Sequence, residues 1–113
     1  MPRTFTMPKN RAPIRPGEIL EEEYRIPLGL TQQQFADALG IDRERYSAVA
    51  TGRRRVTPGT AIRLAKVLGT SVELWLNMQM MCDLYEAQHG EDARAARSLK
   101  PLLTGRGGKG AAR

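Results

Sequence analysis

The sequence predicts an all-α protein, a five-helix domain whose fifth helix joins two copies of the chain. Three observations predict this class. Apolar residues recur at the i, i+3, i+4 and i+7 spacing of a helix, most clearly between Ala61 and Leu68. Helix-starting and helix-ending residues alternate at short intervals along the chain. No segment sustains the period-two alternation expected of a half-buried strand.

The chain opens with a basic, proline-containing arm over 1–14, which we expect to be extended or mobile. The first helix should follow over 16–26. Pro16 suits its first turn, and negative charge from four glutamates gathers in its N-terminal half. Pro27 and Gly29 are expected to end it.

The second and third helices have clear end signals. Thr31 is a good N-cap, and Gln34 three residues later completes a capping box. Gly40 suits the left-handed position after a helix. The third helix should begin with Asp42 as its N-cap and stop at Gly52.

The fourth helix should start at Thr57 and close at Gly69, and the fifth should run from Ser71 to about residue 88. The glycine-rich, basic end of the chain is typical of a disordered tail. The expected segments are the arm 1–14, a helix-turn-helix domain 15–70 with its central motif at about 31–52, a dimerisation helix 71–90 and a largely disordered tail 91–113.

Composition narrows the function classes. Eighteen Lys and Arg residues stand against 12 Asp and Glu, a net charge of +6, which favours an anionic partner such as nucleic acid. With one cysteine and one histidine, we expect no disulfide, no metal site, no cofactor and no enzyme. The N-terminus lacks the apolar run of a signal peptide, and no membrane span is evident, so a cytoplasmic protein is expected.

The connection at 40–42 is the central feature. A glycine there allows a sharp turn between two helices, and Ile41 beside it can anchor the turn in the core. The small side chain of Ala36 lets the third helix approach closely. Tyr46 and Val49 would pin the third helix, leaving its opposite face, with Ala48, exposed. The alternative is a helical hairpin of an unrelated α-bundle with solvated arginines; a glycine corner alone would not distinguish the two, but the whole combination favours DNA binding.

The exposed face of the third helix carries residues suited to reading DNA. Residues near the N-terminus of a recognition helix reach base edges, where arginine pairs with guanine and glutamate accepts from cytosine. Our candidate base contacts are Arg43, Glu44, Arg45 and Ser47. Basic residues after this helix, and the N–H groups that start the second, suit phosphates. Our candidate phosphate contacts are Gln32, Thr51, Arg53 and Arg54.

These residues lie in a stretch that resembles a known family. Residues 30–69 resemble the Cro/C1-type (lambda repressor-like) helix-turn-helix domain. The flanking segments RPGEILEEEYRIPLGLT (15–31) and LGTSVELWLNMQMMCDLYEA (68–87) resemble the HigA/VapI antitoxins of type II toxin–antitoxin modules. The resemblance covers about residues 15–88.

The resemblance implies a dimer that binds operator DNA, represses its own promoter and neutralises a small toxin, often an mRNA-cleaving enzyme of the RelE or HigB kind. It also implies DNA contacts at Gln32, Arg43, Glu44 and Thr51. The chain departs from the family pattern at Asp42, where Ser is common, and at Tyr46, where Ile is common.

The fifth helix is apolar on more than one side. One stripe should face the core, and the other predicts a two-fold dimer, because a domain this small has little else to cover it. Our candidate dimer residues are Leu76, Met80 and Leu84. The alternative is that the first helix or the tail folds over this stripe.

Other functions remain open at this stage. The chain could be a solitary regulator without a toxin partner, or a module whose helices bind a protein and no DNA. An enzyme is disfavoured, since the sequence shows neither a catalytic Ser/His/Asp set nor a P-loop.

Overall fold

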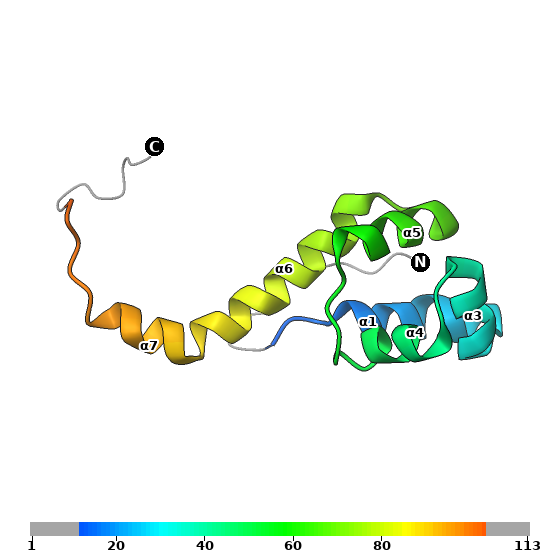
Figure 1. Cartoon of the computed structure of the whole chain (residues 1–113), viewed down its shortest axis with the longest axis horizontal. Coiled ribbons are helices and arrows are strands. Elements are labelled where there is room, and N and C mark those ends of the chain that lie inside the picture. Colours follow the sequence, from blue (N-terminus) through cyan, green and yellow to red (C-terminus); the bar gives the residue numbers. More distant parts are fainter. Residues whose placement is uncertain (1–11, 104–113) are drawn as a thin grey trace.

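The computed structural model describes residues 12–103, and every regular element in this range is a helix (Figure 1). The expected all-α class is therefore confirmed. In chain order the elements are α1 Pro16–Ile19, η1 Leu20–Arg25, α2 Ile26–Leu28, α3 Gln32–Leu39, α4 Arg43–Ala50, α5 Pro58–Leu68, α6 Val72–Gln88 and α7 Glu91–Arg97. Calls for residues 1–11 and 104–113, in the arm and the tail, lie outside the described residues.

The first three elements form one continuous helical stretch, which we call helix 1. Its middle part, η1, is a π-helix, and the N–H of Ile26 donates to the carbonyl of Glu21. Helix 1 continues past residue 26, where it was expected to end, and Pro27 lies within it in the short element α2. Gly29 ends it with a φ of 72°.

The caps of α3 are those that the sequence predicts. The Gln34 N–H donates to Thr31 Oγ1 at 3.0 Å, and the Thr31 N–H donates to Gln34 Oε1 at 2.8 Å. Gly40 is left-handed, with a φ of 74°. The guanidinium of Arg63 donates to the Leu39 carbonyl at 3.0 Å and the Gly40 carbonyl at 3.2 Å, so α5 caps the C-terminus of α3.

The core forms where helix 1, α3, α4, α5 and α6 meet. Trp75 is fully buried, and its indole N–H donates to Thr70 Oγ1 at 2.6 Å. The largest fully buried side chains are Trp75, Tyr46, Phe35, Ile19, Leu20, Leu64 and Val56. This core packs side chains of helix 1, α5 and α6 together with those of α3 and α4, on either side of the corner.

The segment 91–113 was expected to be largely disordered, but residues Glu91–Arg97 form a sixth helical stretch, α7. Acidic residues occupy its first turn and basic residues its last turn, which complements the helix dipole. Three alanines add helix propensity. The described part of the segment therefore departs from the expected tail at Glu91–Arg97, where charges and alanines favour a helix despite the glycine-rich sequence that follows.

The helix α6 extends beyond the other helices. Figure 1 shows its first half beside α5 and its second half projecting away, with α7 at the far end from α3. Met80 and Leu84 on this projecting half are 59% and 52% exposed, whereas Leu76 packs against the core. Within the described range, no helix has the length and apolar character needed to cross a membrane.

Candidate nucleic-acid interface

The first turn of α4 projects from the domain. Asp42 caps the helix by accepting the Arg45 N–H at 2.7 Å. The Asp42 carboxylate therefore serves as the N-cap of α4, which explains why aspartate is accepted at a position where the family commonly has serine. The next three side chains, Arg43, Glu44 and Arg45, are all exposed, as a base-reading position requires.

The second turn of α4 is held in the core. Tyr46 and Val49 are buried, as expected. Ala48 was expected on the exposed face, but it is 7% exposed, and this interpretation was wrong. Its small side chain allows the following loop to fold back, and its carbonyl accepts the N–H groups of Arg53 at 2.8 Å and Arg54 at 3.0 Å. Ser47 is half-buried.

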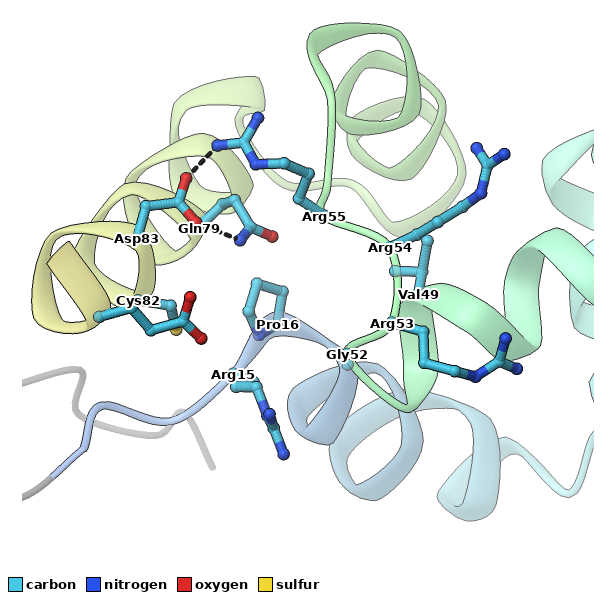
Figure 2. A pocket seen from close by; sticks show the side chains of 12 residues that line it. Arg15, Pro16, Val49, Gly52, Arg53, Arg54, Arg55, Gln79, Cys82 and Asp83 are labelled. Carbon is cyan, nitrogen blue, oxygen red and sulfur yellow. Dashed lines mark hydrogen bonds and ion pairs between the residues drawn. The ribbon is translucent and has the colours of Figure 1, made fainter. Parts of the chain in front are cut away.

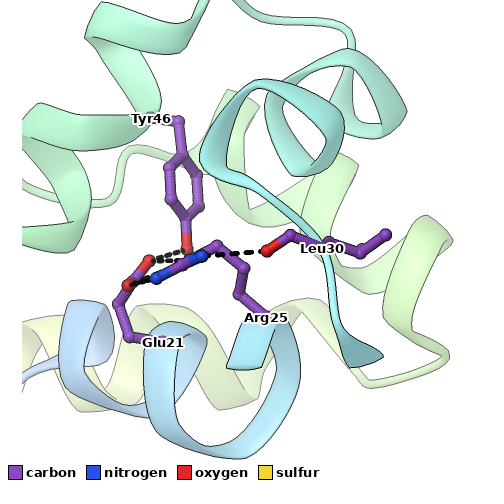
Figure 3. A network of polar contacts seen from close by, with 4 residues as sticks. All are labelled: Glu21, Arg25, Leu30 and Tyr46. Carbon is purple, nitrogen blue, oxygen red and sulfur yellow. Dashed lines mark hydrogen bonds and ion pairs between the residues drawn. The ribbon is translucent and has the colours of Figure 1, made fainter. Parts of the chain in front are cut away.

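A polar network ties α4 to helix 1 (Figure 3). The hydroxyl of Tyr46 donates to Glu21 Oε2 at 2.6 Å. Arg25 pairs with the same carboxylate at 2.6 Å and also donates to the Leu30 carbonyl at 2.8 Å. Tyr46, which departs from the family pattern, therefore has a specific partner.

The network changes how its members titrate. The hydrogen bond from Arg25 is the main cause that lowers the pKa of Glu21; burial opposes it, and Tyr46 and Gln32 add to the lowering. Burial, followed by the Glu21 contact, raises the pKa of Tyr46. The phenol therefore keeps its proton and remains a donor to a charged carboxylate. Gln32, expected at a phosphate, is half-buried and also faces Glu21.

The loop after α4 separates its three arginines. Figure 2 shows Arg53 and Arg54 pointing away from α6, while Arg55 points toward Asp83, with which it forms an ion pair. Arg53 and Arg54 are exposed and lie near the exposed end of the loop. The hydroxyl of Thr51 donates to the Ser47 carbonyl at 2.9 Å, so its proton is already engaged within α4.

Three residues that position this site were missed by sequence reasoning. Arg63 caps α3, Gln79 accepts the Val56 N–H at 2.7 Å, and Gly17 lets helix 1 approach the end of α4. A Cβ on Gly17 would lie 2.4 Å from the carbonyl oxygens of Val49 and Ala50. For Gly17, a glycine inside an expected helix was the signal that the sequence offered.

A glycine corner, a buried second turn and a projecting first turn define a helix-turn-helix protein. The family model described as Helix-turn-helix matches residues 22–75. Virulence-associated protein I of Dichelobacter nodosus is 39% identical over 97 residues, which cover 85% of this chain and 88% of that protein. Antitoxin HigA-1 of Vibrio cholerae is 36% identical over 93 residues, 82% of this chain and 87% of that protein.

A solved structure described as antitoxin GraA in complex with its operator superposes with a TM-score of 0.75 at 31% identity. The match covers 88% of this chain and 100% of that one. The chain belongs to the helix-turn-helix family that includes the HigA-type antitoxins and virulence-associated protein I. This family is one of DNA-binding regulators and antitoxins, not of enzymes.

Proposed function

We propose that the protein is a dimeric repressor that binds the promoter of its own gene. The observation that carries the proposal is the exposed first turn of α4, with Arg43 and Glu44 at its tip, beside the exposed Arg53 and Arg54. Residues in such a turn read base edges, and arginines in the adjacent loop bind phosphates. Support comes from the relatives of the same family whose structures contain operator DNA.

The assignment within the interface follows from exposure. Arg43 and Glu44 are the base contacts, with Arg45 and Ser47 beside them, and Arg53 and Arg54 are the phosphate contacts. Thr51 and Gln32 act mainly through the N–H groups and packing of their helices, because the Thr51 hydroxyl is bonded within α4 and the Gln32 side chain is half-buried.

The test is binding of a duplex carrying the promoter of the gene, compared with a mixed-sequence duplex across a salt series. Arg43→Ala should relax sequence preference and cost about 1–3 kcal/mol on the promoter. Arg54→Ala should weaken both duplexes alike and lower the salt slope by about one unit. If both variants bind the promoter as the wild type does, this assignment fails.

We further propose that the protein acts as an antitoxin and neutralises a toxin protein. The support is its family, in which relatives named antitoxin match over most of this chain. Co-expression with the product of the adjacent gene should restore growth when that product is toxic, and the two should co-purify. A solitary regulator would neither rescue growth nor co-purify with that product.

A further inference from the structure

Two side chains on α6 hold the loop that carries the phosphate-binding arginines. Gln79 Oε1 accepts the N–H of Val56 at 2.7 Å, and Gln79 Nε2 donates to Asp83 Oδ1 at 3.0 Å. The other oxygen of Asp83 pairs with Arg55. Figure 2 shows the Gln79–Asp83 and Asp83–Arg55 contacts on the side of the loop away from Arg53 and Arg54. We call this set of contacts the α6 clamp.

The clamp holds the end of the loop that α4 cannot reach. At the start of the loop, the N–H groups of Arg53 and Arg54 are fixed on the Ala48 carbonyl. At its end, Val56 is buried with 2% exposure, and its N–H needs a partner because an unsatisfied buried donor is costly. The Gln79 side chain supplies that partner. The backbone of Arg53 and Arg54 is therefore anchored by α4, and α6 anchors the chain again two residues after Arg54.

The clamp also separates like charges. Arg53, Arg54 and Arg55 follow each other in sequence, and each repels the others. Asp83 pairs with Arg55 and holds it toward α6, whereas Arg53 and Arg54 point away from that helix. An exposed ion pair contributes little stability, so its main effect here is orientation.

We propose that Gln79, held in place by Asp83, is a positioning residue for DNA binding: it fixes the loop so that Arg53 and Arg54 face one phosphate backbone. This inference rests on the proposed DNA-binding function. The inference gives α6 a direct part in the DNA-binding geometry. The same helix carries the exposed Met80 and Leu84, which directly follow Gln79 and Asp83 in sequence.

The first experiment needs no DNA. Gln79→Leu removes the acceptor at similar volume, and amide hydrogen exchange at Val56 should become at least about tenfold faster, since the hydrogen bond that protects it is lost. Gln88→Leu, at the exposed end of the same helix, is the matched control and should leave Val56 exchange unchanged. Unchanged exchange in Gln79→Leu overturns the proposal.

The second experiment is a double-mutant cycle on promoter and mixed-sequence duplexes. Gln79→Leu should weaken binding of both duplexes about equally, and Arg54→Ala should cost at least about threefold less in the Gln79→Leu background than alone. Gln79 and Arg54 are not bonded to each other, so a purely structural role would give additive effects. Additivity overturns the inference while leaving the proposed function intact, whereas a wild type that binds neither duplex at low salt overturns both.

A polarity exchange guards against loss of folding. In Gln79→Glu with Asp83→Asn, the new carboxylate can accept from Val56 and from the asparagine amide, whose oxygen can accept from Arg55. Net charge is unchanged. Relative to Gln79→Leu, this double variant should recover the hydrogen-exchange protection of Val56 and most of the DNA affinity. Gln79→Glu alone places two carboxylates side by side and should recover neither property. Failure of the pair to recover either property contradicts the clamp.

Discussion

Tyr46 shows how one side chain can serve both the core and the site. Its ring is buried against Phe35, with ring centroids 5.1 Å apart, and its hydroxyl reaches Glu21 on helix 1. Because Tyr46 follows directly after the exposed Arg45, this contact fixes the point from which the exposed first turn of α4 projects. A purely apolar residue here would pack but could not set this register.

Tyr46→Phe should lower the free energy of unfolding by about 1.5–3 kcal/mol, the usual worth of a hydrogen bond to a charged group. The ring packing would remain, and Glu21 would still pair with Arg25. Urea denaturation followed by Trp75 fluorescence measures the change. Tyr85→Phe, on the half-buried face of α6, is the control and should stay within about 0.5 kcal/mol of the wild type.

The lowered pKa of Glu21 predicts a loss of stability in acid. A carboxyl whose folded-state pKa lies below its unfolded value stabilises the fold above that unfolded value, about 4.3 for glutamate. The contribution disappears as pH falls through the folded-state pKa. Unfolding free energy should therefore decline as pH falls below about 5, and less steeply in Glu21→Gln. Glu86→Gln is the control and should show the same pH dependence as the wild type. If the unfolding free energy of Glu21→Gln falls with pH as steeply as that of the wild type and the control, the prediction is wrong.

At the scale of elements, the close approach of helix 1 to α4 decides the position of the recognition helix. Gly17 is buried, and backbone carbonyls of Val49 and Ala50 occupy the space that a side chain would need. Helix 1 ends later than its proline suggests, and α7 forms where a tail was expected. For α7, the alanines and the charges at its two ends favour a helix, and the glycine-rich sequence that follows concealed it.

Gly17→Ala should be destabilising by about 1–3 kcal/mol, because the added methyl group overpacks against backbone that cannot move easily. Replacement of a helical glycine by alanine is ordinarily stabilising by about 0.5–1 kcal/mol. Gly59→Ala tests that ordinary case, since its Cβ would meet nothing closer than Thr57 Oγ1 at 4.0 Å. In thermal melting, the melting temperature should fall in Gly17→Ala and rise in Gly59→Ala. A higher melting temperature in Gly17→Ala would contradict the packing argument.

At the scale of the whole molecule, α6 connects the DNA-binding corner to a projecting apolar surface. Its first half completes the core through Trp75, while its second half exposes Met80 and Leu84 (Figure 1). A two-fold dimer that binds two half-sites needs its two copies of α4 about 34 Å apart, on successive turns of DNA. The dimer thus remains our proposal, with α6 as its seam.

Met80→Glu should shift the protein from dimer to monomer at micromolar concentration, because a charge would then lie in the apolar seam. Sedimentation velocity measures the shift. Ile62→Glu is the matched control, since Ile62 has the same 59% exposure but lies on α5. Should Ile62→Glu dissociate the dimer while Met80→Glu does not, the seam lies on α5 instead.

The sequence by itself determined the starts of α3, α4, α5 and α6 and the nature of the corner. Thr31, Asp42, Thr57 and Ser71 all act as N-caps as predicted, because capping links residues three positions apart. Gly40 and Gly69 are left-handed, as C-terminal glycines should be. Helical periodicity also identified Tyr46 as buried.

Only the tertiary structure decided which groups meet across the fold. Tyr46 bonds to Glu21 across 25 positions, Arg63 caps Leu39 across 24, and Arg55 pairs with Asp83 across 28. Such contacts depend on how helices cross, which local spacing does not specify. The same reason separates Arg55 from its neighbours: three adjacent arginines look equivalent in sequence, but the ion pair with Asp83 turns Arg55 toward α6, while Arg53 and Arg54 point away from that helix.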